Sequence, residues 1–254
     1  MQLLVCFAVI AVIAFALERI APARQLPIFR RGLIADGLYV VCNIGLRIVF
    51  TDTLAVGMTE LGRSILPEQF VDILGGQHLI VQAAVIVVVL DFIAYWIHRA
   101  KHHYTWWWRL HETHHSSVDL DWFSSVRFHP IEKILDRTIY LLPLVILGAS
   151  KEALLILAVV DASIASLSHA NTKLRYGPLS YLIVSPELHR FHHSADPDHQ
   201  GKNFGNNLSI FDWIFGTGLL TDEDPSEFGT GDPAYPGQNF FRQFLYAFRR
   251  DSAP

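Results

Sequence analysis

Long apolar blocks alternate with polar stretches along this chain, and their lengths are those of membrane helices. A bilayer core takes about 20 apolar residues in helical form. Residues 3–17, 33–58 and 79–97 form the first three blocks. The third is the most uniform, because Asp91 is its one charged residue. These blocks predict three transmembrane helices.

The first two blocks are less uniform than the third. Residues 3–17 are short enough for a cleavable signal peptide, but no basic segment precedes them, and Glu18-Arg19 stands where small residues should mark a cleavage site. We therefore expect a retained span. The second block contains the polar residues Asp36, Asn43, Arg47 and Asp52. Part of that helix should face protein or the membrane interface, because such side chains are costly in lipid.

Two shorter apolar runs, residues 139–147 and 153–167, follow in the second half of the chain. The segment Gly148-Ala149-Ser150 between them favours a turn. We expect a helical hairpin that enters the membrane and returns. Because two crossings bring the chain back to its starting side, the polar segments before and after the hairpin should meet there.

The composition agrees with a membrane protein. Of the 254 residues, 51% are hydrophobic and 17% are charged, whereas soluble domains carry roughly 25% charged residues. The net charge of −4 gives no reason to expect nucleic acid as a partner. Cys6 and Cys42 lie in apolar stretches without a C-x-x-C, which argues against a disulfide framework. The chain predicts an all-α, polytopic membrane protein with about four to five membrane-embedded helices.

Eight histidines fall into three tight clusters in the polar segments. They are His98 and His102; His111, His114 and His115; and His189, His192 and His193. Their spacings, H-x3-H once and H-x2-H-H twice, place two or three imidazoles on one face of a helix. Neutral imidazole is the commonest metal ligand among side chains, and eight exceed the needs of one ion. The clusters therefore predict a dinuclear metal site at a membrane surface.

Three further residues lie near these clusters in the expected topology. His169 ends the returning helix of the hairpin, at the depth expected for the metals, and His129 follows the second cluster. We take both as candidate ligands. Asp91 precedes His98 by two helical turns, so its carboxylate is placed to accept the second ring N–H of His98 or His102. A hydrogen bond or ion pair between helices is the alternative role for this acid.

Basic residues indicate which side of the membrane these polar segments face. Four arginines lie between the first two blocks: Arg19, Arg24, Arg30 and Arg31. The loop over residues 60–77 is mildly acidic and contains Arg63. By the positive-inside rule the arginine loop is cytoplasmic, and counting crossings places all three histidine clusters there too. Trp106, Trp107 and Trp108 lie between the first two clusters, where we expect them to anchor the chain at the interface.

A different interpretation of the middle cluster starts from His111-Glu112-Thr113-His114-His115. This segment matches H-E-x-x-H, the helix of zinc proteases in which the glutamate is the general base. The match uses only His111 and His115 and leaves six clustered histidines without a role. A membrane-embedded zinc hydrolase or protease is therefore the alternative function. A non-catalytic lipid-binding or metal-storage protein is a third possibility, although storage would not require such an ordered set of ligands.

The metal decides the chemistry, and imidazole ligands alone suit iron, zinc, copper and nickel. Zinc would offer Lewis-acid hydrolysis. Two irons could reduce O2 with external electrons and attack an unactivated C–H bond. An apolar substrate would partition into the bilayer and enter the site from there.

Six segments of the chain resemble the fatty acid hydroxylase / sterol desaturase superfamily of integral-membrane di-iron oxygenases. They are DFIAYWIHRAKH (residues 91–102), WRLHETHHS (108–116), RFHPIE (127–132), HRFHHS (189–194), NFG (203–205) and FDWIFGT (211–217). The resemblance covers roughly residues 80–220 in the family's order. It implies a helical membrane base with a cytosolic, histidine-rich cap that holds two irons, with zinc as a possible substitute. It also implies O2-dependent hydroxylation or desaturation of a membrane lipid.

By this resemblance the eight clustered histidines are ligands, with His169 and His129 as further candidates. Residues 1–78 are then N-terminal membrane helices, 79–220 the catalytic domain and 221–254 a polar tail. Nothing in the chain resembles a haem, flavin or ferredoxin domain, so a separate reductase or small electron carrier is implied. The C-terminal residues carry no ER-retrieval lysine signal, which favours a bacterial inner membrane. The sequence does not select the lipid or decide between hydroxylation and desaturation.

Overall fold

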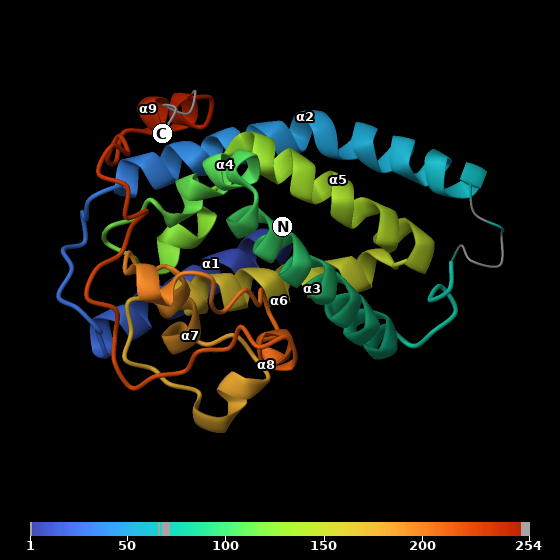
Figure 1. Cartoon of the computed structure of the whole chain (residues 1–254). Coiled ribbons are helices and arrows are strands. Elements are labelled where there is room, and N and C mark those ends of the chain that lie inside the picture. Colours follow the sequence, from blue (N-terminus) through green and yellow to red (C-terminus); the bar gives the residue numbers. More distant parts are fainter. Residues whose placement is uncertain (1, 66, 68–71, 250–254) are drawn as a thin grey trace.

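The computed structural model describes residues 2–65, 67 and 72–249, and this part of the chain is built from helices without a named strand (Figure 1). The long helices are α1 (Gln2–Ile20), α2 (Leu33–Ile65), α3 (Leu79–His103), α5 (Pro130–Leu147) and α6 (Lys151–His169). Short helices form a cap at one end: α4 (Thr105–His115), η2 (Trp122–Val126), η3 (Gly177–Tyr181), α7 (Pro186–His192), η4 (Pro197–His199), α8 (Ile210–Ile214) and α9 (Phe240–Tyr246). The all-α prediction is confirmed.

Each apolar block predicted from the sequence lies within one of the long helices. Helices α1, α3 and α6 are long and apolar enough to cross a membrane, and Leu33–Leu46 of α2 is a shorter apolar segment. Helix α5 begins at Pro130, well before the apolar run expected at residues 139–147. Its first turns carry four charged residues: Glu132, Lys133, Asp136 and Arg137. Of the loop expected at residues 60–77, positions 66 and 68–71 lie outside the described residues.

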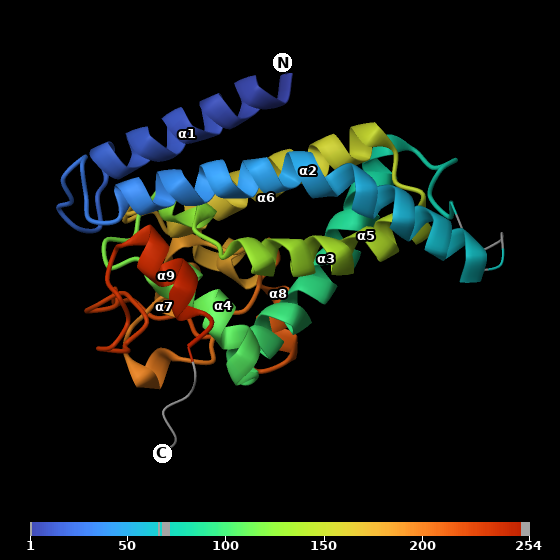
Figure 2. The same ribbon diagram turned by 90° about the horizontal axis from the view of Figure 1, so that it is seen from above.

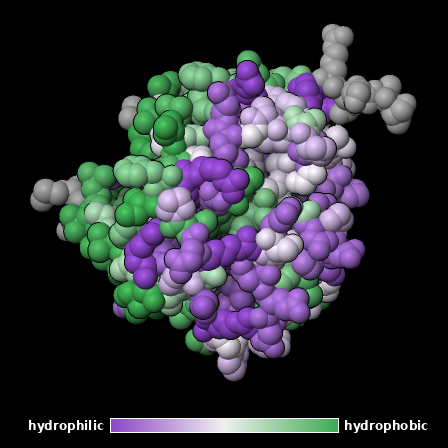
Figure 3. Space-filling view, turned by 90° about the vertical axis from the view of Figure 1, so that its left-hand side faces the viewer, coloured by the Kyte–Doolittle hydropathy of each residue, from purple (hydrophilic) through white to green (hydrophobic). Residues whose placement is uncertain are grey.

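The long helices pack in pairs that leave one side of the molecule apolar. Helix α1 packs against α6, α2 packs along α5, and α3 packs against α5 and α6 (Figure 2). Apolar side chains on α1 are largely exposed, with Leu4 at 74% and Val12 at 67%. In the space-filling view, apolar residues gather on one side and polar residues on the other (Figure 3). This division is that of a helical base embedded in lipid and a cap in water.

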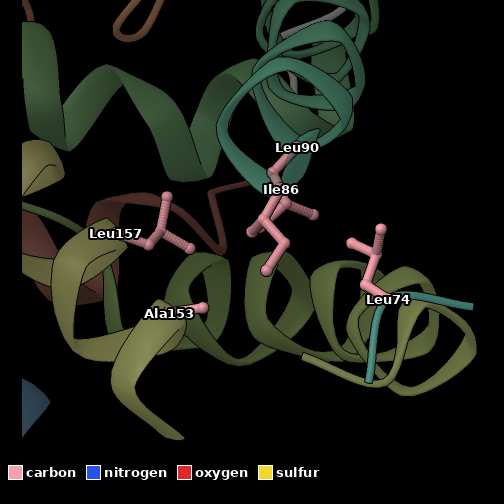
Figure 4. Packing of buried hydrophobic residues seen from close by; sticks show 5 residues of the cluster. All are labelled: Leu74, Ile86, Leu90, Ala153 and Leu157. Carbon is pink, nitrogen blue, oxygen red and sulfur yellow. The ribbon is translucent and has the colours of Figure 1, made fainter. Parts of the chain in front are cut away.

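A small apolar core joins the helices at the end away from the cap. Leu74, Ile86, Leu90, Ala153 and Leu157 meet where α3 crosses α6 and the segment before α3 (Figure 4). Ile86 and Ala153 are completely buried. The close approach of α3 and α6 fixes the ends of both helices relative to each other, and those ends carry His98, His102 and His169.

Two sharp turns position the histidine-bearing helices. Tyr104 has an extended backbone (φ −95°, ψ 118°), which ends α3 and turns α4 back over its last residues. Gly148 has φ +63°, and a Cβ there would lie 2.1 Å from Asp72 Oδ1, so the turn requires glycine. Ser150 then caps α6 by accepting from the Ala153 amide at 3.2 Å. The turn predicted at Gly148-Ala149-Ser150 is confirmed.

The arginine-rich loop between α1 and α2 lies against the cap. Arg30 is buried and pairs with Asp36 at 2.6 Å and with Asp121, while Arg31 pairs with Asp119 at 2.6 Å. The arginine loop and the histidine-bearing segments therefore share one side of the molecule, as predicted. Acids of the protein pair with Arg30 and Arg31, so both arginines form structural ion pairs.

The C-terminal segment, expected to be a polar surface tail, packs over the cap. Phe228 is 6% exposed, and Gln243 of α9 is completely buried and donates to Ser116 Oγ at 3.2 Å. Asp224 accepts two hydrogen bonds from the buried Arg190, each 2.8 Å long. The Asp, Gly and Pro residues of the C-terminal segment form turns, and side chains between these turns contact the cap.

Candidate metal centre

Nine histidines converge in the cap as two groups. In each group the ligand nitrogens, one per residue, lie within 4.8 Å of one another. The first group is His98, His102, His111, His115 and His192. The second group is His114, His169, His189 and His193. All eight histidines of the three sequence clusters are included, together with His169, and the structure thus brings together nine of the ten candidate ligands.

Helix geometry explains why each H-x2-H-H cluster serves both groups. On α4, His111 and His115 are four residues apart and share a face, whereas His114 is turned away from His115 by about 100°. His111 and His115 consequently join the first group and His114 the second. The third cluster divides in the same way: His192 enters the first group, and His189 and His193 enter the second. Two neighbouring sites are thus built from shared helices.

Hydrogen bonds fix the orientation of five of the nine rings through their Nδ1 atoms. The acceptors are Phe204 O for His98 (2.9 Å), Glu132 Oε1 for His111 (2.7 Å), Arg127 O for His114 (3.1 Å), Ala165 O for His169 (2.8 Å) and Lys202 O for His192 (2.8 Å). Because a carbonyl or carboxylate can only accept, Nδ1 carries the proton. The Nε2 lone pair of each ring then remains available to a metal ion.

The buried Nε2 atoms of the first group have no hydrogen-bond partner among the described residues. This holds for His98, His102, His111, His115 and His192. In the second group the Nε2 atoms lie against one another instead: His193 to His189 at 3.0 Å, His189 to His169 at 3.1 Å and His169 to His114 at 3.3 Å. Nitrogens bound to one metal ion at 2.0–2.1 Å lie roughly this far apart. The first group fits a metal ion because buried polar atoms without partners are costly, and the second group fits one by the spacing of its nitrogens.

The protonation state of these rings also suits metal binding. Burial lowers the pKa of His192 from its ordinary 6.5 to about 4. Burial, with neighbouring imidazoles as a second cause, lowers the pKa of the other cap histidines well below 6.5: His111, His114, His115, His189 and His193. The rings are therefore neutral near pH 7, and neutral imidazole is the form that binds metals.

A buried charge network supports His111. Glu132 Oε1 accepts from His111 Nδ1 at 2.7 Å and from Lys101 Nζ at 2.8 Å, and Lys101 also bonds Asp136 at 2.8 Å. Carboxylates that accept from a metal-ligating histidine orient the ring and raise its basicity. The histidine pattern did not reveal this network, although Lys101 lies between His98 and His102 and Glu132 lies in the RFHPIE segment.

Asp91 does not contact the histidines, contrary to one of its two expected roles. Its carboxylate accepts from the backbone amides of Asn207 (2.9 Å) and Leu208, and from the Asn207 side chain at 3.0 Å. The Nδ1 atom of His98 is already bonded to Phe204 O. Asp91 therefore acts indirectly, because it holds the loop whose Phe204 carbonyl orients His98.

His129 lies outside both groups, so its position does not support the ligand role expected for it. Its Nε2 bonds the carbonyl of Phe244 at 3.2 Å, and its Nδ1 accepts from the Ile131 amide at 3.3 Å. The ring stacks on Phe244 with centroids 4.8 Å apart. Both nitrogens are thus used in fixing the start of α5 and the packing of the C-terminal segment.

Glu112, the general base of the zinc-hydrolase interpretation, has its own partner away from the histidine nitrogens. It is buried and forms an ion pair with Arg249 at 2.9 Å.

Among the tryptophans, Trp106 is 56% exposed, as expected for an anchor, whereas Trp108 packs on the rings of His102 and His115, with ring centroids 4.9 Å and 5.2 Å apart.

A cavity of about 610 Å³ opens beside the two groups. It lies between α2, α3, α5 and α6, and His98, His111, His114, His169 and His189 line it. Much of the remaining lining is apolar, including Leu90, Ala94, Phe128, Leu157 and Ala162. A cavity of this size and character suits the apolar part of a lipid.

An all-helical membrane base, two buried histidine groups and an adjoining cavity define the class of protein. Residues 83–217 match the family described as fatty acid hydroxylase, which is just over half of the chain. The chain belongs to this family, and the resemblance seen in its histidine segments is confirmed.

Three relatives show what this chain is similar to. The ornithine lipid hydroxylase OlsE of Rhizobium tropici is 34% identical over 164 residues, which cover 65% of this chain and 49% of that protein. Alkylglycerol monooxygenase of Xenopus tropicalis is 31% identical over 130 residues (50% and 28%). The very-long-chain aldehyde decarbonylase CER1 of Arabidopsis thaliana is 28% identical over 141 residues (50% and 22%). The chain thus spans half or less of the length of these relatives. No solved structure matches it.

Proposed function

We propose that this protein oxidises a membrane lipid with O2 at a pair of irons, by hydroxylation or desaturation. The observation that carries the proposal is the pair of histidine groups, nine histidines in all, that lie beside a largely apolar cavity between candidate membrane helices. Family membership and relatives named for lipid hydroxylation and mono-oxygenation support it. Zinc is the metal that could replace iron at such ligands.

In this proposal the first group holds one metal ion and the second group holds the other. Two irons would supply the activation of O2 with electrons from a separate donor, a reductase or small electron carrier. The chain itself contributes three things: ligands held in one orientation by Glu132 and backbone carbonyls, burial that keeps the imidazoles neutral, and a cavity that aligns the lipid with the histidines. The position that is oxidised then depends on which carbon of the lipid lies next to the histidine groups.

The proposed location is a bacterial inner membrane, with the histidine groups on the cytoplasmic side. Support comes from the arginine loop, which lies against the cap through Arg30 and Arg31. A lipid would reach the cavity from the bilayer and the electron donor would reach the cap from the cytoplasm.

The test is metal content together with O2 consumption, on protein purified anaerobically in detergent and assayed with a surrogate electron donor and a lipid extract. We expect about two irons per chain and lipid-dependent O2 uptake, lost in His114→Ala and His192→Ala but kept in His103→Ala, which changes an exposed neighbouring histidine. Full activity in His114→Ala or His192→Ala would refute the ligand assignment.

The zinc-hydrolase alternative makes an opposite prediction at Glu112. A hydrolase that used Glu112 as its base should lose peptide cleavage in Glu112→Gln, whereas lipid oxidation should fall only as far as the lost ion pair with Arg249 loosens the cap. Tightly bound zinc after iron-replete expression, with no O2 uptake, would favour hydrolysis or a non-catalytic role.

A further inference from the structure

One cation that lines the cavity forms no hydrogen bond with the described residues, although Glu132, Asp136 and Asp161 lie close enough to act on its charge. Lys133 of α5 lines the cavity, and its Nζ lies 3.4 Å from the centre of the Phe128 ring. No hydrogen bond or ion pair of this ammonium group occurs in the described part of the chain. An ammonium group has three donors, and removing it from water without acceptors is costly. Lys133 is therefore a charge that a ligand in the cavity could satisfy.

The acids that line the same cavity are already engaged. Asp91 accepts from the loop amides of Asn207 and Leu208, Asp136 accepts from Lys101 at 2.8 Å, and Asp161 accepts from the Asn207 side chain at 2.6 Å. Arg137 lines the cavity one helical turn after Lys133, on the same face of α5. The α5 side of the cavity thus carries Lys133, Arg137 and the acid Asp136, which is paired with Lys101.

Lys133 is connected to the histidines through stacked rings. The Phe128 ring beneath its ammonium group stacks on His114 of the second group, with centroids 4.2 Å apart and planes 11° from parallel. A cation over an aromatic face is held in place by the ring's quadrupole. Lys133 and His114 of the second histidine group therefore contact the same Phe128 ring.

We propose that Lys133 binds the anionic group of an amphiphilic substrate, a carboxylate or a phosphate, inside the cavity. The inference rests on the proposed function, because it takes the cavity as the place where the lipid binds. The charged end of the lipid would then be fixed beside Phe128, and the position oxidised would be set by its distance from that charge. A neutral lipid of equal chain length would bind more weakly.

Binding can be measured without turnover. Spin-labelled stearic acid and its methyl ester share one acyl chain, but the ester has a methyl group in place of the negative charge. The fraction of each that is immobilised on detergent-solubilised protein gives its affinity. We expect the acid to bind wild-type protein about tenfold or more tightly than the ester, since loss of a charge-assisted hydrogen bond usually costs at least that factor. Equal affinities for acid and ester in the wild-type protein would overturn the proposal without any variant.

Three variants locate the effect. Lys133→Met should weaken binding of the acid about tenfold and leave the ester unchanged, and Lys133→Arg should restore acid binding. Lys151→Met, which removes an exposed lysine at the start of α6, should change neither. An unchanged metal content in Lys133→Met would show that the cap is intact. Acid binding that Lys133→Met leaves untouched would also overturn the proposal.

Competition distinguishes the two sources of the anion. Displacement of spin-labelled stearate by phosphatidic acid, but not by diacylglycerol, would assign a phosphate headgroup, whereas displacement by unlabelled stearate alone would assign a carboxylate. Failure of the proposed function has a different signature: wild-type protein would show no lipid-dependent O2 uptake while still preferring acid over ester. When uptake is present, Lys133→Met should raise KM for the anionic lipid far more than it lowers kcat.

Discussion

Replacement of Glu132 by Gln should weaken one of the two metal sites selectively. Glu132 is completely buried and is the acceptor for His111 Nδ1 at 2.7 Å, while its second partner is Lys101 Nζ at 2.8 Å. Glutamine keeps the shape of the side chain and an oxygen that can accept from the imidazole. It removes the negative charge that orients His111 and raises the basicity of the ring.

The expected magnitude follows from the contacts that remain. Loss of a partner of a metal-ligating histidine typically costs 10- to 100-fold in metal affinity, which is roughly 1.4–2.8 kcal/mol. Stability should fall by roughly 1.5–3 kcal/mol, the value of a hydrogen bond to a charged group. The larger loss of roughly 3–5 kcal/mol for an isolated buried charge should not occur, because Asp136 still pairs with Lys101 at 2.8 Å.

The assay is metal retention during titration with a chelator, followed by metal analysis of the protein. Glu132→Gln should release the ion of the first group at a lower chelator concentration and retain the ion of the second group, so that an intermediate with about one metal per chain accumulates. Glu152→Gln, which changes an exposed acid on α6, is the matched control. Wild-type retention of both ions by Glu132→Gln would refute the role of this carboxylate in holding His111.

Other predictions concern the second site, the cap and pH. His193→Ala should lower the metal content by about one ion per chain through the second group, and a normal content by metal analysis would exclude His193 as a ligand. Arg30→Met should destabilise the protein by about 3–5 kcal/mol, because it breaks a buried ion pair, whereas Arg31→Met, whose side chain is 70% exposed, should cost at most ~1 kcal/mol. Thermal unfolding in detergent would compare the two, and equal losses would contradict the reasoning. Metal-free protein should lose stability as the pH falls from 6.5 towards 4, since the folded state holds the pKa of His192 at about 4 and the unfolded state takes up protons first; that residue alone contributes about 3 kcal/mol. Unfolding midpoints that do not change between pH 7.5 and 5 would refute this.

The parts of the site that the sequence predicted are those encoded by local spacing. H-x3-H and H-x2-H-H place imidazoles on one helical face whatever the rest of the fold does, so the eight clustered histidines could be chosen in advance. His169 was predictable because the hairpin must return to its starting side. Its three partners, His114, His189 and His193, come from two other segments of the chain, and their convergence with His169 depended on tertiary packing.

The ligand role of His129 and one of the two roles of Asp91 were expected from proximity in sequence, and the structure places both residues elsewhere. His129 follows the second cluster closely, but it faces Phe244 of the C-terminal segment. Asp91 lies on the helix of His98, yet its hydrogen-bond partners are Asn207 and Leu208, more than a hundred residues later. Such pairings depend on which loop the fold brings to a side chain, and no local pattern carries that information.

The sequence by itself determined the helical class, the apolar blocks that become the long helices, and the eight clustered histidines as candidate ligands. The apolar periodicity and the histidine spacings extend over one or two helical turns. The regular backbone hydrogen bonding of a helix therefore decides which of these side chains share a face. Only the tertiary structure decided how nine histidines divide into groups of five and four, that Glu132 supports His111, and that Lys133 faces the cavity beside Phe128. Each of these depends on the angle at which helices from distant segments pack, and side-chain packing over the whole molecule sets that angle.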